Sequence, residues 1–180
     1  MKQLALRFKR KPESVGVMGN KFRALPPASE WAVRETEQRL GFTLRPPLRR
    51  IYREVANGGF GPGYGVMGVE GGFTDDLGDT VADLYLCYRE SSPEDPQWQR
   101  PEFLLPICHW GCIPSSAVDC SRDSGPVYLV DVQGKEPGEP MDSIIKLHKE
   151  SLESWLSDWL DGKNLWREFY SAAQDTNAER

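Results

Sequence analysis

Residues 57–72 read NGGFGPGYGVMGVEGG, and the interpretation of the whole chain starts from this glycine segment. It holds eight glycines, and glycine adopts left-handed and closely packed backbone with no steric penalty. Asn57-Gly58 is a helix stop, because both residue types tolerate the left-handed conformation that ends a helix. The sequence therefore predicts an extended loop here, with at most a short strand over residues 64–69.

Residues 63–68 match the G-x-G-x-x-G pattern that holds a pyrophosphate at a helix N-terminus. That fingerprint needs a strand before it and a helix directly after it. Here a helical pattern precedes, and Glu70-Gly71-Gly72 follows, which places a carboxylate and helix breakers where the helix would begin. We therefore interpret the glycines as a requirement of backbone geometry and predict no cofactor.

Two helices are predicted upstream of the glycine segment. Ser29 is a suitable N-cap for the first, and Gly41 can take the left-handed conformation that closes it. Pro46-Pro47 pre-sets the start of the second helix. Its apolar residues then follow at helical spacing: Leu48, Ile51, Tyr52 and Val55.

The period of the apolar residues changes downstream of the glycine segment. A third helix is predicted from near Asp79 to Glu90, and Ser151 caps a final amphipathic helix that closes at Gly162. Between them lie short β-prone runs that indicate an antiparallel meander, over residues 104–109, 117–120, 126–131 and 143–148. The predicted fold class is α+β, a single domain with a mainly antiparallel sheet and helices packed on one face.

The chain of 180 residues is long enough for one hydrophobic core. We assign the domain to residues 27–170 and a polar C-terminal tail to residues 171–180. Residues 1–26 form an N-terminal extension whose order the sequence leaves open. The alternation of Leu4, Leu6 and Phe8 within it is a weak strand signal.

Composition predicts a cytoplasmic location. The first ten residues carry four basic side chains but no uninterrupted apolar run, so neither a signal peptide nor a membrane span is expected. The four cysteines are too few and too unevenly spaced for a disulfide framework, which favours reduced thiols. We therefore predict no membrane partner.

Charge is distributed unevenly along the chain. Residues 1–50 hold 12 Lys/Arg against 4 Asp/Glu, whereas residues 51–180 hold 10 against 23. An acidic surface of this kind can recruit a basic partner. The alternative is that basic helices lie across acidic loops of the same fold, and the sequence favours this simpler interpretation.

The run Cys108-His109-Trp110-Gly111-Cys112, with Cys120 beyond it, has the residue types of a zinc site but not the paired spacing of one. We predict no metal and interpret the thiols as small buried apolar groups. Cys108 and His109 would point to opposite faces of a strand, so they cannot form a catalytic pair. A pairing of Cys120 with His148 leaves a thiol enzyme as an open alternative.

Two acidic runs are the candidate partner-binding residues: Asp75, Asp76, Asp79 and Asp83 in the first, and Glu90, Glu94 and Asp95 in the second. Asp79 and Asp83 would be neighbours at i, i+4 on the third helix, a repulsive pair that a basic partner would relieve. The alternative is an acidic helix N-terminus that complements the helix dipole.

In order along the chain, the motifs resemble the SUKH superfamily, the Smi/Knr cell-wall-regulator-like domains. The resemblance rests on Glu37-x-x-Leu40-Gly41, a Pro before Leu48-Arg49-x-x-Tyr52, Asn57-Gly58-Gly59-Phe60-Gly61, Leu105-Pro106-Ile107-Cys108-x-Trp110-Gly111, Val118-Asp119, Gly125-Pro126-Val127 and Ser154-Trp155-Leu156. It covers residues 29–161. Its structural motif residues are Asn57, Gly58, Gly59, Gly61, Trp110, Gly111 and Trp155.

The resemblance implies an α+β fold without shared catalytic residues. Many bacterial members resemble immunity proteins that bind and neutralise toxins, often nucleases, and a fungal member is a signalling and assembly scaffold. We therefore expect a non-enzymatic protein-binding domain whose partner is a protein, with a basic toxin domain as the first expectation and no direct contact with nucleic acid. A general interaction scaffold is the alternative. The oligomeric state stays open.

Overall fold

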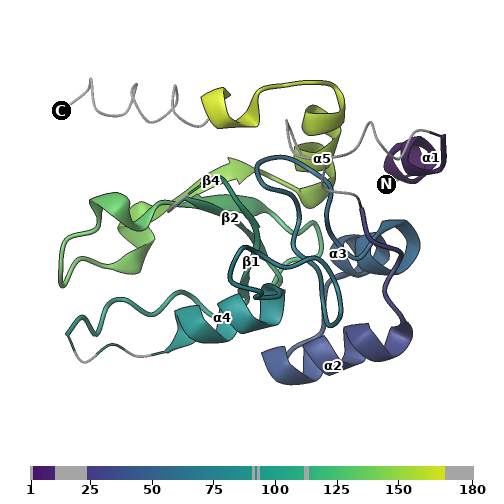
Figure 1. Cartoon of the computed structure of the whole chain (residues 1–180). Helices are drawn as coiled ribbons and strands as arrows, with labels where there is room; N and C mark the ends of the chain where they lie inside the picture. The colour runs from purple at the N-terminus through teal and green to yellow at the C-terminus, as the bar shows by residue number, and fades with distance from the viewer. Residues whose placement is uncertain (1, 11–23, 91, 93, 112–113, 169–180) are drawn as a thin grey trace.

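The fold is that of a computed structural model of the chain, which describes residues 2–10, 24–90, 92, 94–111 and 114–168 (Figure 1). The helices are α1 (Lys2–Arg10), α2 (Glu30–Leu40), α3 (Pro46–Arg50), the π-helical turn η2 (Ile51–Val55), α4 (Val81–Arg89) and α5 (Leu152–Leu160). The strands are β1 (Leu104–His109), β2 (Ser115–Asp119), β3 (Val127–Val130) and β4 (Ile145–Lys149), with the short 3-10 turns η3 (Val132–Gly134) and η4 (Met141–Ile144) after β3.

The sheet is an antiparallel meander in which β1, β2, β3 and β4 pair in chain order, as the spacing of the β-prone runs predicts. Side chains of one face, such as Leu105, Val118 and Val127, join the helices in the main core. α4 packs beside β1 and α5 beside β4. The opposite face carries a smaller cluster around Ala117 and Val130. The α+β fold class is confirmed.

Both ends of α2 follow from its flanking residues. The Ser29 hydroxyl accepts a hydrogen bond from the Ala32 amide at 3.0 Å, and Gly41 has a φ of 77°. The predicted cap and stop are therefore both confirmed. Val33 and Leu40 point into the core, which fixes the face that α2 buries.

The second predicted helix begins at Pro46 but changes character at Ile51. The backbone bond from Ala56 N–H to Ile51 C=O, 3.1 Å long, spans five residues and marks a π turn. The wider turn places Tyr52 fully inside the core, where its hydroxyl donates to the Met67 carbonyl at 2.9 Å. The helix is thereby fastened to the glycine segment.

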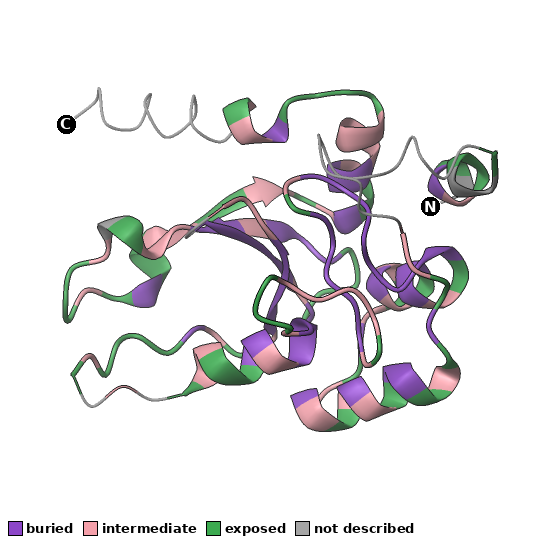
Figure 2. Ribbon diagram, in the orientation of Figure 1, coloured by how far each residue is buried: buried purple, intermediate pink, exposed green. Residues whose placement is uncertain are grey.

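The glycine segment is buried over most of its length and lies against β1 (Figure 2). Tyr64 and Met67 donate backbone bonds to β1 at 2.9 Å each, and an isolated bridge joins Val66 to Cys108. A side chain at Gly63 would meet the His109 carbonyl at 2.3 Å, so only glycine allows this approach. The predicted extended loop is confirmed, with a single bridge as its only strand character among the described residues.

Asn57 holds the glycine segment closed. Its side-chain oxygen accepts from the Val69 amide at 2.9 Å, and its amide nitrogen donates to the Glu70 carbonyl at 3.3 Å. Asn57 is 4% exposed, so these bonds replace water that the buried backbone cannot reach. The residue that ends the helix therefore also holds the loop closed.

The expectation of strand character around Leu4 is wrong, because residues 2–10 form α1. Leu, Lys, Arg, Gln and Ala are strong helix formers, and tertiary packing stabilises a helix that is too short to persist alone. Leu4 is 1% exposed in the main core, and Arg7 donates to the Leu160 carbonyl of α5 at 2.7 Å. The rest of the predicted N-terminal extension up to residue 23, and the predicted tail 171–180, lie outside the described residues.

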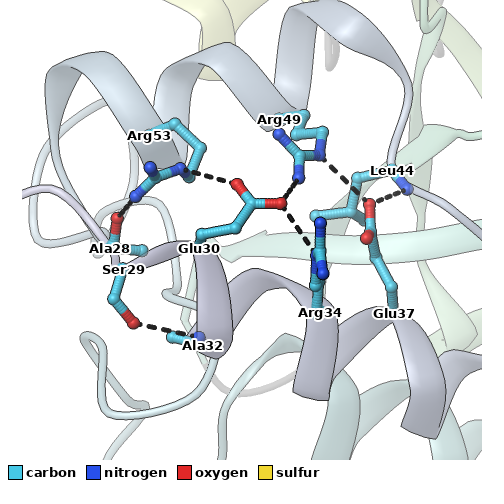
Figure 3. A network of polar contacts seen from close by, with 9 residues as sticks. All are labelled: Ala28, Ser29, Glu30, Ala32, Arg34, Glu37, Leu44, Arg49 and Arg53. Atoms are coloured by element: carbon cyan, nitrogen blue, oxygen red, sulfur yellow. Dashed lines mark hydrogen bonds and ion pairs between the residues drawn. The ribbon is translucent and has the colours of Figure 1, made fainter.

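Arginines of the N-terminal half are bound inside the fold. The Glu30 carboxylate of α2 pairs with Arg49 and Arg53 of the next helix and with Arg34 of its own (Figure 3). Glu37 adds a contact to Arg49 at 3.5 Å and accepts from the Leu44 amide at 2.9 Å. These ion pairs therefore hold the two helices together.

Among the described residues, no helix has the length and apolar character of a membrane span.

Candidate functional site

A tight acidic turn of residues 75–79, here named the Leu77 turn, joins the glycine segment to α4. One oxygen of the Asp75 carboxylate accepts from the amides of Leu77 and Asp79, both at 2.9 Å. Backbone bonds from Asp75 N–H to Asp79 C=O and from Gly78 N–H to Asp75 C=O close the turn. The turn holds itself together and presents Leu77 to solvent with 86% of its surface exposed.

A pocket of about 750 Å³, here named the Leu77 pocket, opens beside the Leu77 turn. Its walls come from the glycine segment, α4 and the end of β1. Apolar groups make up the wall, with three carboxylates of the turn at the rim: Leu25, Tyr64, Met67, Phe73, Leu77, Leu84, Cys87 and Tyr88, with Asp75, Asp76 and Asp79. A group that enters the pocket would therefore meet apolar surface within reach of negative charge.

The imidazole of His109 also lines the pocket, with its Nε2 atom 3.9 Å from the Asp75 carboxylate. Burial lowers the pKa of His109, and the attraction of Asp75 offsets this only in part. The imidazole is therefore neutral at neutral pH and does not cancel the charge of the rim. Nε2 is buried and accepts or donates no hydrogen bond among the described residues.

Two of the three rim carboxylates have no cationic partner among the described residues. Asp76 and Asp79 form no ion pair with any residue that the structure describes. Partial burial raises the pKa of Asp79, and the neighbouring Asp75 and Asp83 carboxylates raise it further. Mutual repulsion of this kind is relieved when a cation approaches.

Asp83 has a structural role instead. It closes a capping box with Thr80 at the start of α4, and it pairs with Arg39 of α2. Burial alone would raise the pKa of Asp83, but the bonds from Arg39 and Thr80 outweigh it and lower the pKa to about 2. The alternative of an acidic helix N-terminus thus describes Asp83. Asp79 lies one residue before the Thr80 cap, so the predicted placement of Asp79 on the helix is wrong.

The second acidic run does not join the first. Glu90 ends α4, about 14 Å along the helix axis from its start. Asp95 is bound to Lys135, whose side chain is 1% exposed, and to the Gly138 amide at 3.3 Å, and Lys135 lowers its pKa. Glu94 is exposed and does not line the pocket. The structure therefore places three of the seven candidate acids, Asp75, Asp76 and Asp79, in one site.

Sequence reasoning missed the apolar half of this site. Tyr64 and Tyr88 come from distant elements, and no local pattern links them. The sequence does contain a sign of Leu77, because an isolated leucine between Asp76 and Gly78 is unusual in a polar turn. From the sequence, His109 is a candidate only as a metal ligand or a base.

The two buried thiols, Cys108 and Cys120, lack the setting of a nucleophile. Cys108 is fully buried, and burial raises its pKa to about 12. Burial and the nearby Asp119 likewise raise the pKa of Cys120 to about 12. Cys120 follows β2 whereas His148 lies on β4, two strands away or roughly 10 Å, so the two cannot share a proton. Cys112 lies outside the described residues, among which no cluster suits a metal ion.

A second pocket of about 350 Å³, here named the Trp31 pocket, lies next to α2. Trp31, 65% exposed, stands at its edge, and Leu25 lines both pockets. Its only carboxylate among the described lining residues is Glu70, which contacts Arg39 at 3.7 Å. This surface is therefore less acidic than the Leu77 pocket.

The model of the SMI1/KNR4 family (SUKH-1) matches residues 27–158. The match contains the glycine segment, the four strands of the sheet and most of α5. All seven structural motif residues named from the sequence fall inside it. Trp155 among them is fully buried in the core, and Trp110 donates to the Ser116 hydroxyl at 2.8 Å. A comparison with curated proteins found no match.

Proposed function

Because the chain belongs to the SMI1/KNR4 family (SUKH-1), we propose that it is a non-enzymatic protein-binding domain of the immunity type. It binds and occludes a toxin in the bacterial cytoplasm. The observation that carries this proposal is the Leu77 pocket. There the exposed side chain of Leu77 lies beside Asp76 and Asp79, which form no ion pair among the described residues. Such a surface suits recognition of a basic protein rather than a chemical step.

The mechanism is stoichiometric occlusion. A nuclease has the matching charge, because its substrate-binding cleft must attract phosphates. An acidic inhibitor is drawn towards such a cleft, which raises the rate of encounter, and then covers it. No residue of the chain needs to react, which agrees with the buried thiols of Cys108 and Cys120.

Co-expression with the toxin domain of a neighbouring gene tests this proposal. We expect restored growth and a one-to-one complex on gel filtration. A toxin domain with its catalytic residue replaced is the matched partner, since it should form the same complex without affecting growth. If growth stays arrested and no complex forms, the immunity proposal is wrong.

A general interaction scaffold is the second candidate, and the Trp31 pocket favours it. Two exposed apolar surfaces that meet at Leu25 would give one domain a second place to bind a partner. Pull-down from the native organism distinguishes the candidates. A scaffold retains housekeeping proteins in cells that lack any toxin gene, whereas an immunity protein does not.

A further inference from the structure

The Leu77 turn has the form of a preorganised anchor. Its backbone is fixed by the Asp75 carboxylate and by its own amide bonds, so docking Leu77 orders little additional chain. An exposed leucine loses water contact only if a partner covers it. The turn therefore supplies one exposed apolar contact at the pocket.

The pocket beside the turn suits a side chain with an apolar stem and a positive end. The methylenes of arginine or lysine can lie along Met67, Phe73 and Leu84, as long basic side chains commonly do on apolar surface. The charged end then reaches Asp76 and Asp79 at the rim. One ring face of Tyr88 is already covered by the Arg100 guanidinium, 3.5 Å from its centre, and the carboxylates are the charged partners that the pocket offers to a cation.

Phosphate groups do not fit this chemistry, since the rim carries carboxylates and His109 is neutral. The same charge disfavours an anionic membrane surface and a nucleic acid. The complementary occupant is thus a positively charged protein surface.

We propose that the Leu77 turn and its pocket dock a basic side chain flanked by apolar residues on the surface of the partner protein. This inference rests on the proposed function, whose partner is a basic toxin domain. It adds the place of contact and the kind of side chain received there.

The first test uses the full chain, labelled for NMR, and two capped peptides of sequence SLRLS and SLELS. We expect the arginine peptide to shift the backbone amides of Tyr64, Leu77 and Cys87, and the glutamate peptide to leave them unchanged. The Asp76→Asn/Asp79→Asn variant should lose the response. Equal responses to both peptides, or none, would overturn the inference, and so would shifts confined to the surface around Trp31.

The second test places single arginine substitutions in the co-expression assay. Asp76→Arg and Leu77→Arg change exposed side chains of the turn, so the fold should persist, which a thermal melt checks. We expect each to weaken toxin binding at least about tenfold and to abolish rescue. The matched controls are Glu150→Arg and Leu147→Arg, which are exposed and do not line the pocket.

The outcomes separate the two proposals. If wild type rescues growth and both turn variants rescue equally well, the docking surface is wrong and the immunity function stands. If Trp31→Arg alone abolishes rescue, the second pocket is the docking surface instead. If wild type fails to rescue but the arginine peptide occupies the pocket, the docking chemistry stands and the toxin proposal fails.

Discussion

Gly58 and Gly71 both have left-handed backbone, with φ of 83° and 67°, but their surroundings differ. A Cβ at Gly58 would lie 2.6 Å from the Val66 carbonyl oxygen, whereas one at Gly71 would meet nothing within 4 Å. Gly71→Ala should cost about 1–2 kcal/mol of unfolding free energy from backbone strain alone. Gly58→Ala should cost at least about 2 kcal/mol more, because the loop must also shift. Urea denaturation of both variants measures the difference, and equal losses would contradict the crowded packing.

Asp83 predicts a pH dependence of stability. Its pKa falls from 3.8 to about 2 in the folded chain, so its stabilising effect is complete above pH 3.8 and is lost as the pH falls through 2. Asp83→Asn should therefore lower the unfolding free energy at pH 7 by on the order of 1–2 kcal/mol, allowing for the 32% exposure of the side chain. The deficit should shrink towards pH 2.

Urea unfolding of wild type and variant at several pH values between 7 and 2 follows that deficit. Asp142→Asn, at an exposed carboxyl, controls for the removal of one negative charge. A deficit that does not change with pH would mean that Asp83 acts through packing or the Thr80 cap rather than through its charge.

Local chemistry decides which single residues could be predicted. Ser29 and Gly41 act on their own helix, so the sequence suffices to locate them. The sequence gives no sign that Asp83 and Asp95 form ion pairs, because their partners Arg39 and Lys135 lie about 40 residues away. Only the folded structure therefore distinguishes the acidic residues that line the pocket from those that form ion pairs within the fold.

At the scale of elements, Leu4 and Leu6 of α1 form a matched pair. Leu4 is 1% exposed and Leu6 is 51% exposed. Leu4→Ala should destabilise the chain by about 2–5 kcal/mol, because it leaves a cavity in the main core. Leu6→Ala should change stability by less than about 0.5 kcal/mol. Thermal and urea unfolding check this, and similar small effects for both would show that α1 is not part of the cooperative unit.

The elements predicted well are those with local signals at both ends. Proline, serine and glycine mark α2, α3 and α5, and turn residues separate the four strands. α1 has no such marks, and its helical state is decided by burying Leu4 against the rest of the core. The sequence also does not predict the π turn at Ile51, because the spacing of its apolar residues is the same as in a regular α-helix.

At the scale of the whole molecule, the uneven charge of the sequence has two parts. Arg39 of α2 pairs with Glu70 and Asp83, which agrees with the simpler interpretation of basic helices across acidic loops, whereas Arg49 and Arg53 pair with Glu30 inside the basic part of the sequence. Asp76 and Asp79 have no such counterpart among the described residues. These two carboxylates therefore place negative charge without an ion-pair partner at the Leu77 pocket, a local feature that the net charges of residues 1–50 and 51–180 do not reveal.

Local negative charge makes the salt dependence of partner binding a test of the pocket. Exposed charges act over about 10 Å at 0.1 M salt and about 3 Å at 1 M. The association rate with the toxin domain should fall about tenfold or more over this range, while dissociation changes less. Asp76→Asn/Asp79→Asn should flatten the dependence, as measured by stopped-flow mixing. Glu150→Gln/Asp142→Asn removes the same charge outside the pocket and should keep the wild-type slope. Equal slopes for the two variants would mean that net charge, not the pocket, attracts the partner.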